Sequence, residues 1–203
     1  MTIQIAITGP ESTGKSTLAQ DLALHFKASC LKEYAREHIA SLDRKYSYED
    51  VLIIAERMIE ERHKILDIRN QKSEVRSQKK NRDSQITNNW QPSTDNSPTS
   101  DFLFFDTELI NIKIWLEFYE WNVPNWITEN IIKNPFDLYL LMDIDLPWIP
   151  DEQRANPNDR TFLFQKFEDE LKKIKANYVI INGTENERFK NAITAIKDYS
   201  RRV

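Results

Sequence analysis

Apolar positions along this chain follow two alternating periods. Residues 2–8 place Ile3, Ile5 and Ile7 at every second position, which predicts a strand. The next apolar segment, 15–27, repeats every three to four residues, which predicts a helix packed through one face.

The same alternation continues to the end of the chain. Further strands are expected at 28–33, 102–106, 136–142 and 177–182. Further helices are expected at 34–42, 48–68, 107–121, 125–133, 161–174 and 185–200. Strands that alternate with helices indicate an α/β fold in three layers, built on a parallel and five-stranded sheet.

One long segment breaks this pattern. From about 69 to 100 the residues are almost all polar, with Val75, Ile86 and Trp90 as exceptions, so we expect a largely disordered surface insertion. Its first half is basic, which is compatible with a phosphate or nucleic-acid contact, although a solvated loop is the favoured interpretation. The chain is then one domain, 1–203, interrupted at 69–100.

Between the first strand and the first helix lies Gly9-Pro10-Glu11-Ser12-Thr13-Gly14-Lys15-Ser16, which matches the P-loop pattern G-x-x-x-x-G-K-[ST]. The chain has only 3 glycines, and two of them frame this motif. Backbone N–H groups and the helix N-terminus can hold an anion there, so a P-loop NTPase fold and ATP binding are predicted. The residues expected to bind the nucleotide are Gly9, Glu11, Ser12, Thr13, Gly14, Lys15, Ser16 and Thr17.

Composition narrows the class of protein. The 203 residues carry a net charge of −4, which gives no general attraction to nucleic acid or to anionic membranes. A single cysteine excludes an intramolecular disulfide. No signal-peptide pattern or long apolar run is present, so we expect a cytoplasmic protein without a membrane partner.

Asp106 closes an apolar strand, at the place where a P-loop protein holds Mg²⁺. Together with Ser16 it forms the predicted metal site. The alternative is that Asp106 caps the helix that follows.

A lid is expected at 143–160, which is polar and interrupted by prolines. Arg154 and Arg160 could stabilise charge on a phosphoryl group in transfer, and a closed lid would exclude water. Surface ion pairs with neighbouring acids are the alternative.

Residues beside the second strand are candidates for substrate binding. Ligands of open α/β sheets bind beyond the carboxyl ends of the strands, where Glu33, Tyr34 and Arg36 lie. Glu33 could bind a sugar hydroxyl or act as general base, and Tyr34 could stack on a flat ring. An acidic first turn of a helix would explain the same residues.

Other candidates are aromatic or follow the last strand. Trp115 and Tyr119 share a helix face, where such residues are more often core than substrate-binding. Asn182, after the last strand, is a candidate for contact with adenine. The three histidines are scattered and make no metal set.

Four motifs in order resemble the ribosylnicotinamide kinase domain of NadR-type proteins. They are the P-loop with Ile7 and Thr8 before it, Glu33-Tyr34-Ala35-Arg36-Glu37, Phe105-Asp106-Thr107, and Pro147-Trp148 followed by Asp151, Arg154 and Arg160. The resemblance covers about 1–68 and 101–200, and it implies an adenylate-kinase-like fold.

The resemblance also implies transfer of the ATP γ-phosphate to the 5′-hydroxyl of nicotinamide riboside. By motif, Lys15 would bind phosphate and Ser16 would bind Mg²⁺. Asp106 would contact the metal or the hydroxyl. The two arginines would belong to the lid, and Tyr34 would stack on the pyridine ring. NadR proteins also carry an adenylyltransferase domain. This sequence has no second nucleotide-binding signature, so only the kinase activity is implied.

Two functions from different classes follow. The first is a small-molecule kinase, in which Lys15, Asp106, Glu33, Arg154 and Arg160 are catalytic and Glu33 or Asp106 orients the hydroxyl. The second is a nucleotide-dependent switch or binding module that hydrolyses ATP or GTP slowly and contacts a partner through the insertion. The paired arginines and the Glu33 motif favour the kinase.

Overall fold

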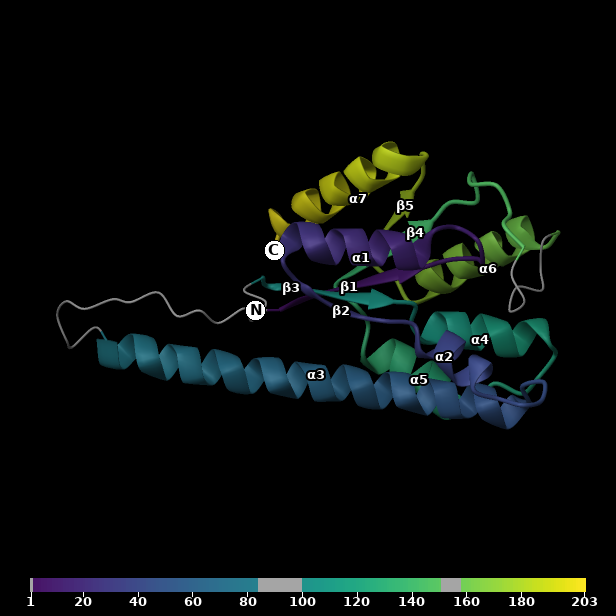
Figure 1. The fold of residues 1–203 in the computed structure, drawn as a ribbon, viewed down its shortest axis with the longest axis horizontal. Coiled ribbons are helices and arrows are strands. Elements are labelled where there is room, and N and C mark those ends of the chain that lie inside the picture. Colours follow the sequence, from purple (N-terminus) through teal and green to yellow (C-terminus); the bar gives the residue numbers. More distant parts are fainter. Residues whose placement is uncertain (1, 84–99, 151–157) are drawn as a thin grey trace.

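The computed structural model describes residues 2–83, 100–150 and 158–203. Its centre is a parallel sheet of five strands in the order β2-β3-β1-β4-β5 (Figure 1). The strands are β1 (Ile3–Thr8), β2 (Ser29–Leu31), β3 (Phe102–Asp106), β4 (Leu138–Met142) and β5 (Tyr178–Ile181). All five expected strands and their parallel arrangement are confirmed.

Helices cover both faces of the sheet (Figure 1). One face packs against α1 (Lys15–Phe26) and α7 (Glu185–Ser200). The other packs against α2 (Tyr34–Ala40), α3 (Tyr48–Asp83), α4 (Leu109–Phe118), α5 (Asn125–Lys133) and α6 (Arg160–Lys173). The molecule therefore has three layers, as the alternation of periods predicts.

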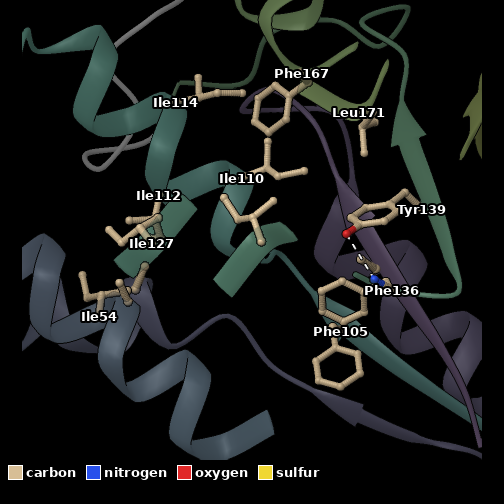
Figure 2. Close-up of a cluster of buried hydrophobic side chains, with 14 of the residues drawn as sticks. Ile54, Phe105, Ile110, Ile112, Ile114, Ile127, Phe136, Tyr139, Phe167 and Leu171 are labelled. Carbon is tan, nitrogen blue, oxygen red and sulfur yellow. Dashed lines mark hydrogen bonds between the residues drawn. The ribbon is translucent and has the colours of Figure 1, made fainter. Parts of the chain in front are cut away.

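The strands are apolar on both faces because both faces are covered. In β1, Ile5 and Ile7 pack toward α1, whereas Ala6 between them packs in the opposite layer. Figure 2 shows the larger cluster, in which side chains from α3, α4, α5 and α6 meet those of β3 and β4. There the buried Tyr139 hydroxyl accepts a hydrogen bond from the Phe136 amide at 3.1 Å.

One expectation about the polar segment is wrong. The helix predicted to end at Ile68 runs on to Asp83, so 69–83 is helical rather than disordered. Lys, Arg, Gln and Glu have high helix propensity, and extension of an anchored helix avoids the cost of nucleation. The remainder of the predicted insertion, 84–99, lies outside the described residues.

The helix after β3 begins two residues later than expected. Thr107 takes a positive φ of 71°, and Glu108 becomes the N-cap by accepting a hydrogen bond from the Ile110 amide at 2.7 Å. Asp106 is therefore not the cap of α4, and its carboxylate is available for another role. Among the described residues, no helix combines the length and the apolar character needed to cross a membrane.

Candidate active site

The loop between β1 and α1 has the backbone of an anion-binding turn. Gly9 has a φ of 130°, and Gly14, at the N-cap of α1, has a φ of 79°. A Cβ atom at Gly9 would lie 3.0 Å from the Met142 carbonyl oxygen and 3.2 Å from its nitrogen. The loop can pass β4 this closely only because the first position is glycine.

Polar side chains hold this loop from inside. The Thr13 hydroxyl donates to the Pro10 carbonyl at 2.8 Å. Lys15 Nζ donates to the carbonyls of Gly9 at 3.0 Å and Pro10 at 2.7 Å, so its ammonium group lies over the loop itself. A positive charge and a helix N-terminus at one point form a site suited to phosphate.

A cavity of about 240 Å³ opens from this loop. Its walls bring together segments that are distant in the sequence: the P-loop, the start of α2, one face of α4, and α6. Besides residues 9–17, it is lined by Glu33, Ala35, Arg36, Ile39, Tyr46, Asn111, Ile114, Trp115, Phe118, Tyr119, Leu163 and Phe167.

Carboxylates lie near the phosphate end of the cavity. Burial raises the pKa of Glu33, and the positive charge of Lys15 opposes this shift. Burial also raises the pKa of Asp106, and hydrogen bonding from Ser16 and the charge of Lys15 oppose it. The charge of Lys15 therefore acts on both acids. Glu33 lines the P-loop cavity, whereas Asp106 lines a second, smaller cavity beside β3.

Ser16 and Asp106 fit the requirements of a Mg²⁺ site. Asp106 is 6% exposed, and its Oδ1 atom accepts no hydrogen bond from any part of the chain that the structure describes. A buried carboxylate oxygen without a donor is costly unless a ligand supplies positive charge. Magnesium prefers one or two protein oxygens together with phosphate oxygens, and Ser16 and Asp106 can supply the protein oxygens.

The other end of the cavity is aromatic. The Tyr46 hydroxyl donates to the Tyr119 hydroxyl at 3.0 Å and accepts from Trp115 Nε1 at 3.3 Å. The rings of Tyr46 and Trp115 meet edge to face, with centroids 5.0 Å apart. Trp115 and Tyr119 are thus part of the cavity wall as well as of the packing around α4.

Sequence reasoning missed Tyr46, which lies in the loop between α2 and α3. Asp50 holds this loop by accepting hydrogen bonds from Arg44 Nη2 at 3.0 Å and from the Ser47 amide at 2.7 Å. A loop residue has no periodic signal.

Asn111 was also missed. It lies in the first turn of α4, where its Oδ1 accepts from the Thr8 hydroxyl at 2.8 Å and its Nδ2 donates to the Gly9 carbonyl at 3.4 Å. A polar residue within an otherwise apolar helix face was the signal that could have found it.

Several predicted site residues lie elsewhere. Tyr34 faces the second, smaller cavity between α3 and β3, with the Arg57 guanidinium 5.8 Å from its ring centroid. Asn182 is exposed, and its Oδ1 accepts a hydrogen bond from Asn191 Nδ2 at 3.1 Å. Asn182 does not line the P-loop cavity. Arg154 lies outside the described residues.

Arg160 joins the lid segment to the P-loop. Its Nη1 donates to the Leu146 carbonyl at 2.8 Å, and its Nη2 donates to the Ser12 carbonyl at 3.3 Å. The Ile149 amide donates to the Ser12 hydroxyl at 2.9 Å. Arg160 therefore contacts the backbone of the P-loop rather than the space in front of it.

Comparisons with known proteins bear on the family and the fold of this chain. A family model described as an AAA domain matches residues 4–188. Among curated proteins, no sequence matches the chain significantly.

Several solved structures have a fold similar to that of this chain. The chain is similar to NadR protein in complex with NR, with a TM-score of 0.69 and 18% identity over 98% of this chain. A NadR structure with NAD and AMP-PNP gives a TM-score of 0.67 and 19% identity, also over 98% of this chain. In both comparisons the chain spans only 50% of the NadR chain.

A shorter kinase matches along its full length. Thymidylate kinase from Ehrlichia chaffeensis has a TM-score of 0.61 and 13% identity, over 97% of this chain and 98% of that chain. The chain therefore has the fold of P-loop nucleoside and nucleotide kinases.

Proposed function

The chain belongs to this AAA-domain family, and we propose that it is an ATP-dependent kinase of small molecules. The reaction we assign is transfer of the γ-phosphate to the ribose 5′-hydroxyl of a nucleoside, with nicotinamide riboside as the first candidate. The observation that carries the proposal is that one cavity contains both a P-loop and an aromatic wall, with Glu33 lining the same space.

The P-loop end suits the phosphate donor. Its backbone amides and Lys15 would hold the phosphates, and Ser16 and Asp106 would hold Mg²⁺, which supplies neutralising charge when bound. Most of the catalysis of phosphoryl transfer is positioning and electrostatic stabilisation, which these groups provide.

The aromatic end suits a flat, positively charged ring. The electron-rich faces of tryptophan and tyrosine attract cations, and Trp115, Tyr119 and Tyr46 surround this part of the cavity. Glu11 lines the same cavity, acts electrostatically on Tyr46, and adds negative charge. The pyridinium ring of nicotinamide riboside combines the flat shape and the positive charge that this wall favours.

Glu33 is the residue we assign as general base. The 5′-hydroxyl oxygen would attack the γ-phosphorus while its proton passes to the Glu33 carboxylate. The bond from the γ-phosphorus to the bridging oxygen breaks, and ADP leaves. Burial makes Glu33 a stronger base than an exposed glutamate, whereas Asp106 is engaged by Ser16 at the metal position.

We assign different roles to the two arginines of the lid. Arg160 would hold the closed lid against Ser12, and Arg154 remains the candidate for direct contact with the transferred phosphoryl group. Tyr34 lies at the second cavity, so we assign ring stacking to the Trp115 and Tyr119 wall instead.

A phosphoryl-transfer assay tests the proposal. The protein is incubated with Mg-ATP and separate acceptors, namely nicotinamide riboside, adenosine, cytidine, uridine and thymidine, and products are identified by mass spectrometry. We expect one added phosphate on nicotinamide riboside in preference to the neutral nucleosides. The Lys15→Ala variant should lose transfer, and Lys197→Ala, on the exposed side of α7, should keep it.

Two results would overturn parts of the proposal. Preferential phosphorylation of a neutral nucleoside would retain the kinase and reject the acceptor. Nucleotide binding without phosphorylation of any acceptor would reject the kinase and favour a nucleotide-dependent switch.

A further inference from the structure

Arg188 of α7 is a buried arginine that the proposed chemistry does not use. Only 4% of its surface is exposed, although it carries a charge. Its Nε donates to the Gly183 carbonyl at 2.8 Å, and its Nη1 donates to the Thr13 carbonyl at 2.8 Å. Its Nη2 forms an ion pair with Asp145.

These contacts join three separate segments at one point. Thr13 belongs to the P-loop, Asp145 follows β4, and Gly183 follows β5. Asp145 Oδ2 also accepts from the Gly183 amide at 2.6 Å, so the carboxylate connects the turn after β5 to the guanidinium. Since arginine presents donors in a fixed plane, this arrangement defines the position of each carbonyl closely.

The contact with Thr13 has a consequence for the peptide bond that follows it. A trans peptide is planar, and its C=O and N–H groups point in opposite directions. A guanidinium that holds the Thr13 carbonyl on the α7 side therefore turns the Gly14 N–H to the opposite side of the loop. Thr13 and Gly14 both line the P-loop cavity, whereas Arg188 does not.

Without the contact from Arg188, the Thr13–Gly14 peptide could rotate easily, because residue 14 is glycine. Its φ of 79° lies in the left-handed region, which glycine enters and leaves at little steric cost. The contacts within the loop hold the carbonyls of Gly9 and Pro10, so the Thr13–Gly14 peptide depends on a contact from outside the loop. Arg188 is the described residue that donates to the Thr13 carbonyl.

We propose that Arg188 is a positioning residue for nucleotide binding, which fixes the Thr13–Gly14 peptide so that the Gly14 N–H faces the bound phosphates. This inference rests on the proposed use of the cavity by a nucleoside triphosphate. It adds to that function a residue on the last helix, about 175 residues after the loop it controls.

Binding of a series of nucleotides tests this role. Competition of AMP, ADP and ATP against a fluorescent ATP analogue is measured for the wild type, Arg188→Met and Arg188→Lys. Gly14 directly precedes Lys15, which in a P-loop reaches the β- and γ-phosphates, so a misdirected Gly14 N–H should weaken ADP and ATP more than AMP, which carries only the α-phosphate. We expect dissociation constants about tenfold higher for ADP and ATP in Arg188→Met, and less than about twofold higher for AMP.

Matched variants separate positioning from general damage. Arg201→Met removes an exposed arginine just after α7 and should leave all three affinities unchanged. Asp145→Asn keeps Arg188 but removes its ionic partner, and should reproduce the ADP effect more weakly. It also serves as the test if Arg188→Met does not fold.

The outcomes distinguish this inference from the proposed function. Equal weakening of AMP, ADP and ATP would show a merely structural role and overturn the inference, as would unchanged ADP affinity. The binding assay contains no acceptor and is therefore independent of the transfer assay. A wild type that binds ADP but phosphorylates no nucleoside would overturn the proposed kinase activity. The role of Arg188 would still be decided by whether Arg188→Met weakens ADP more than AMP.

Discussion

At the scale of single residues, the site depends on a few side chains whose charge is set by their surroundings. The charge of Lys15 acts on both Glu33 and Asp106, and it opposes the rise in pKa that burial causes in each of them. Asp50, by contrast, is an acid whose pKa is held well below its usual range by its hydrogen bond with Arg44. The raised pKa of Glu33 and the lowered pKa of Asp50 lead to different predictions.

Replacement of Glu33 by glutamine tests its assignment as the base. Glutamine keeps the size and hydrogen bonding of the side chain but cannot accept the proton, so kcat should fall by about a hundredfold or more while the KM for ATP changes little. Steady-state kinetics with each substrate varied would measure both constants. A normal kcat would instead favour Asp106.

The Asp50→Asn variant tests the loop that carries Tyr46. An acid with a lowered pKa in the folded state contributes stability above its unfolded-state pKa, near 3.8, and loses that contribution as the pH falls toward the folded-state value. We therefore expect Asp50→Asn to lower the thermal midpoint at pH 7, with a difference from wild type that shrinks below about pH 4.

Thermal unfolding of both proteins at pH 7, 5, 4 and 3.5 would measure this difference. Arg201→Gln, at an exposed pair, is the control. A difference that stays constant down to pH 3.5 would contradict the assignment of the effect to the Asp50 carboxylate.

At the scale of elements, helix α3 shows where local and tertiary information diverge. Its first part packs in the core through Val51, Ile54 and Ala55, and the periodic pattern predicts that part well. Its continuation to Asp83 was not predicted, because a polar sequence has no amphipathic period to recognise. Near the middle, Arg69 Nη1 donates to the Phe102 carbonyl at 2.8 Å and so anchors the helix beside β3.

Removal of the polar segment should leave catalysis intact. Because Arg69 also contacts the Ser100 carbonyl, the chain on either side of the segment comes close together, and a short Gly/Ser linker can replace residues 72–98. We expect kcat and both KM values within about twofold of wild type, since every described residue that lines the P-loop cavity lies outside this segment. Loss of transfer with retained ATP binding would indicate that the segment takes part in function.

At the scale of the whole molecule, the chain corresponds in fold to half of a NadR chain. The described residues hold one P-loop cavity, formed where the segments that follow β1 and β2 meet α4 and α6. A phosphoryl transfer needs one donor site and one acceptor site, and this cavity provides the two ends.

This arrangement predicts a single product. With nicotinamide riboside and excess ATP, the protein should release nicotinamide mononucleotide and ADP and form no NAD, because adenylyl transfer requires a further nucleotide site. Mass spectrometry of the complete reaction mixture would detect both compounds. Formation of NAD would show a second activity in the same chain.

The sequence by itself determined the order of strands and helices and the position of the P-loop. Alternation in β1 and the glycines at 9 and 14 are local properties, readable because burial on both faces and a left-handed turn each demand particular residues. Glu33 and Asp106 could be placed near the P-loop because the carboxyl ends of parallel strands share one edge of the sheet.

The tertiary structure alone decided which side chains share the cavity. Tyr46, in a loop with no periodic signal, enters it, whereas Tyr34 and Asn182 do not. The contact of Arg188 with Thr13 is equally invisible in the sequence. Direction of a side chain depends on loop conformation and on long-range packing, and neither is encoded in the spacing of neighbouring residues.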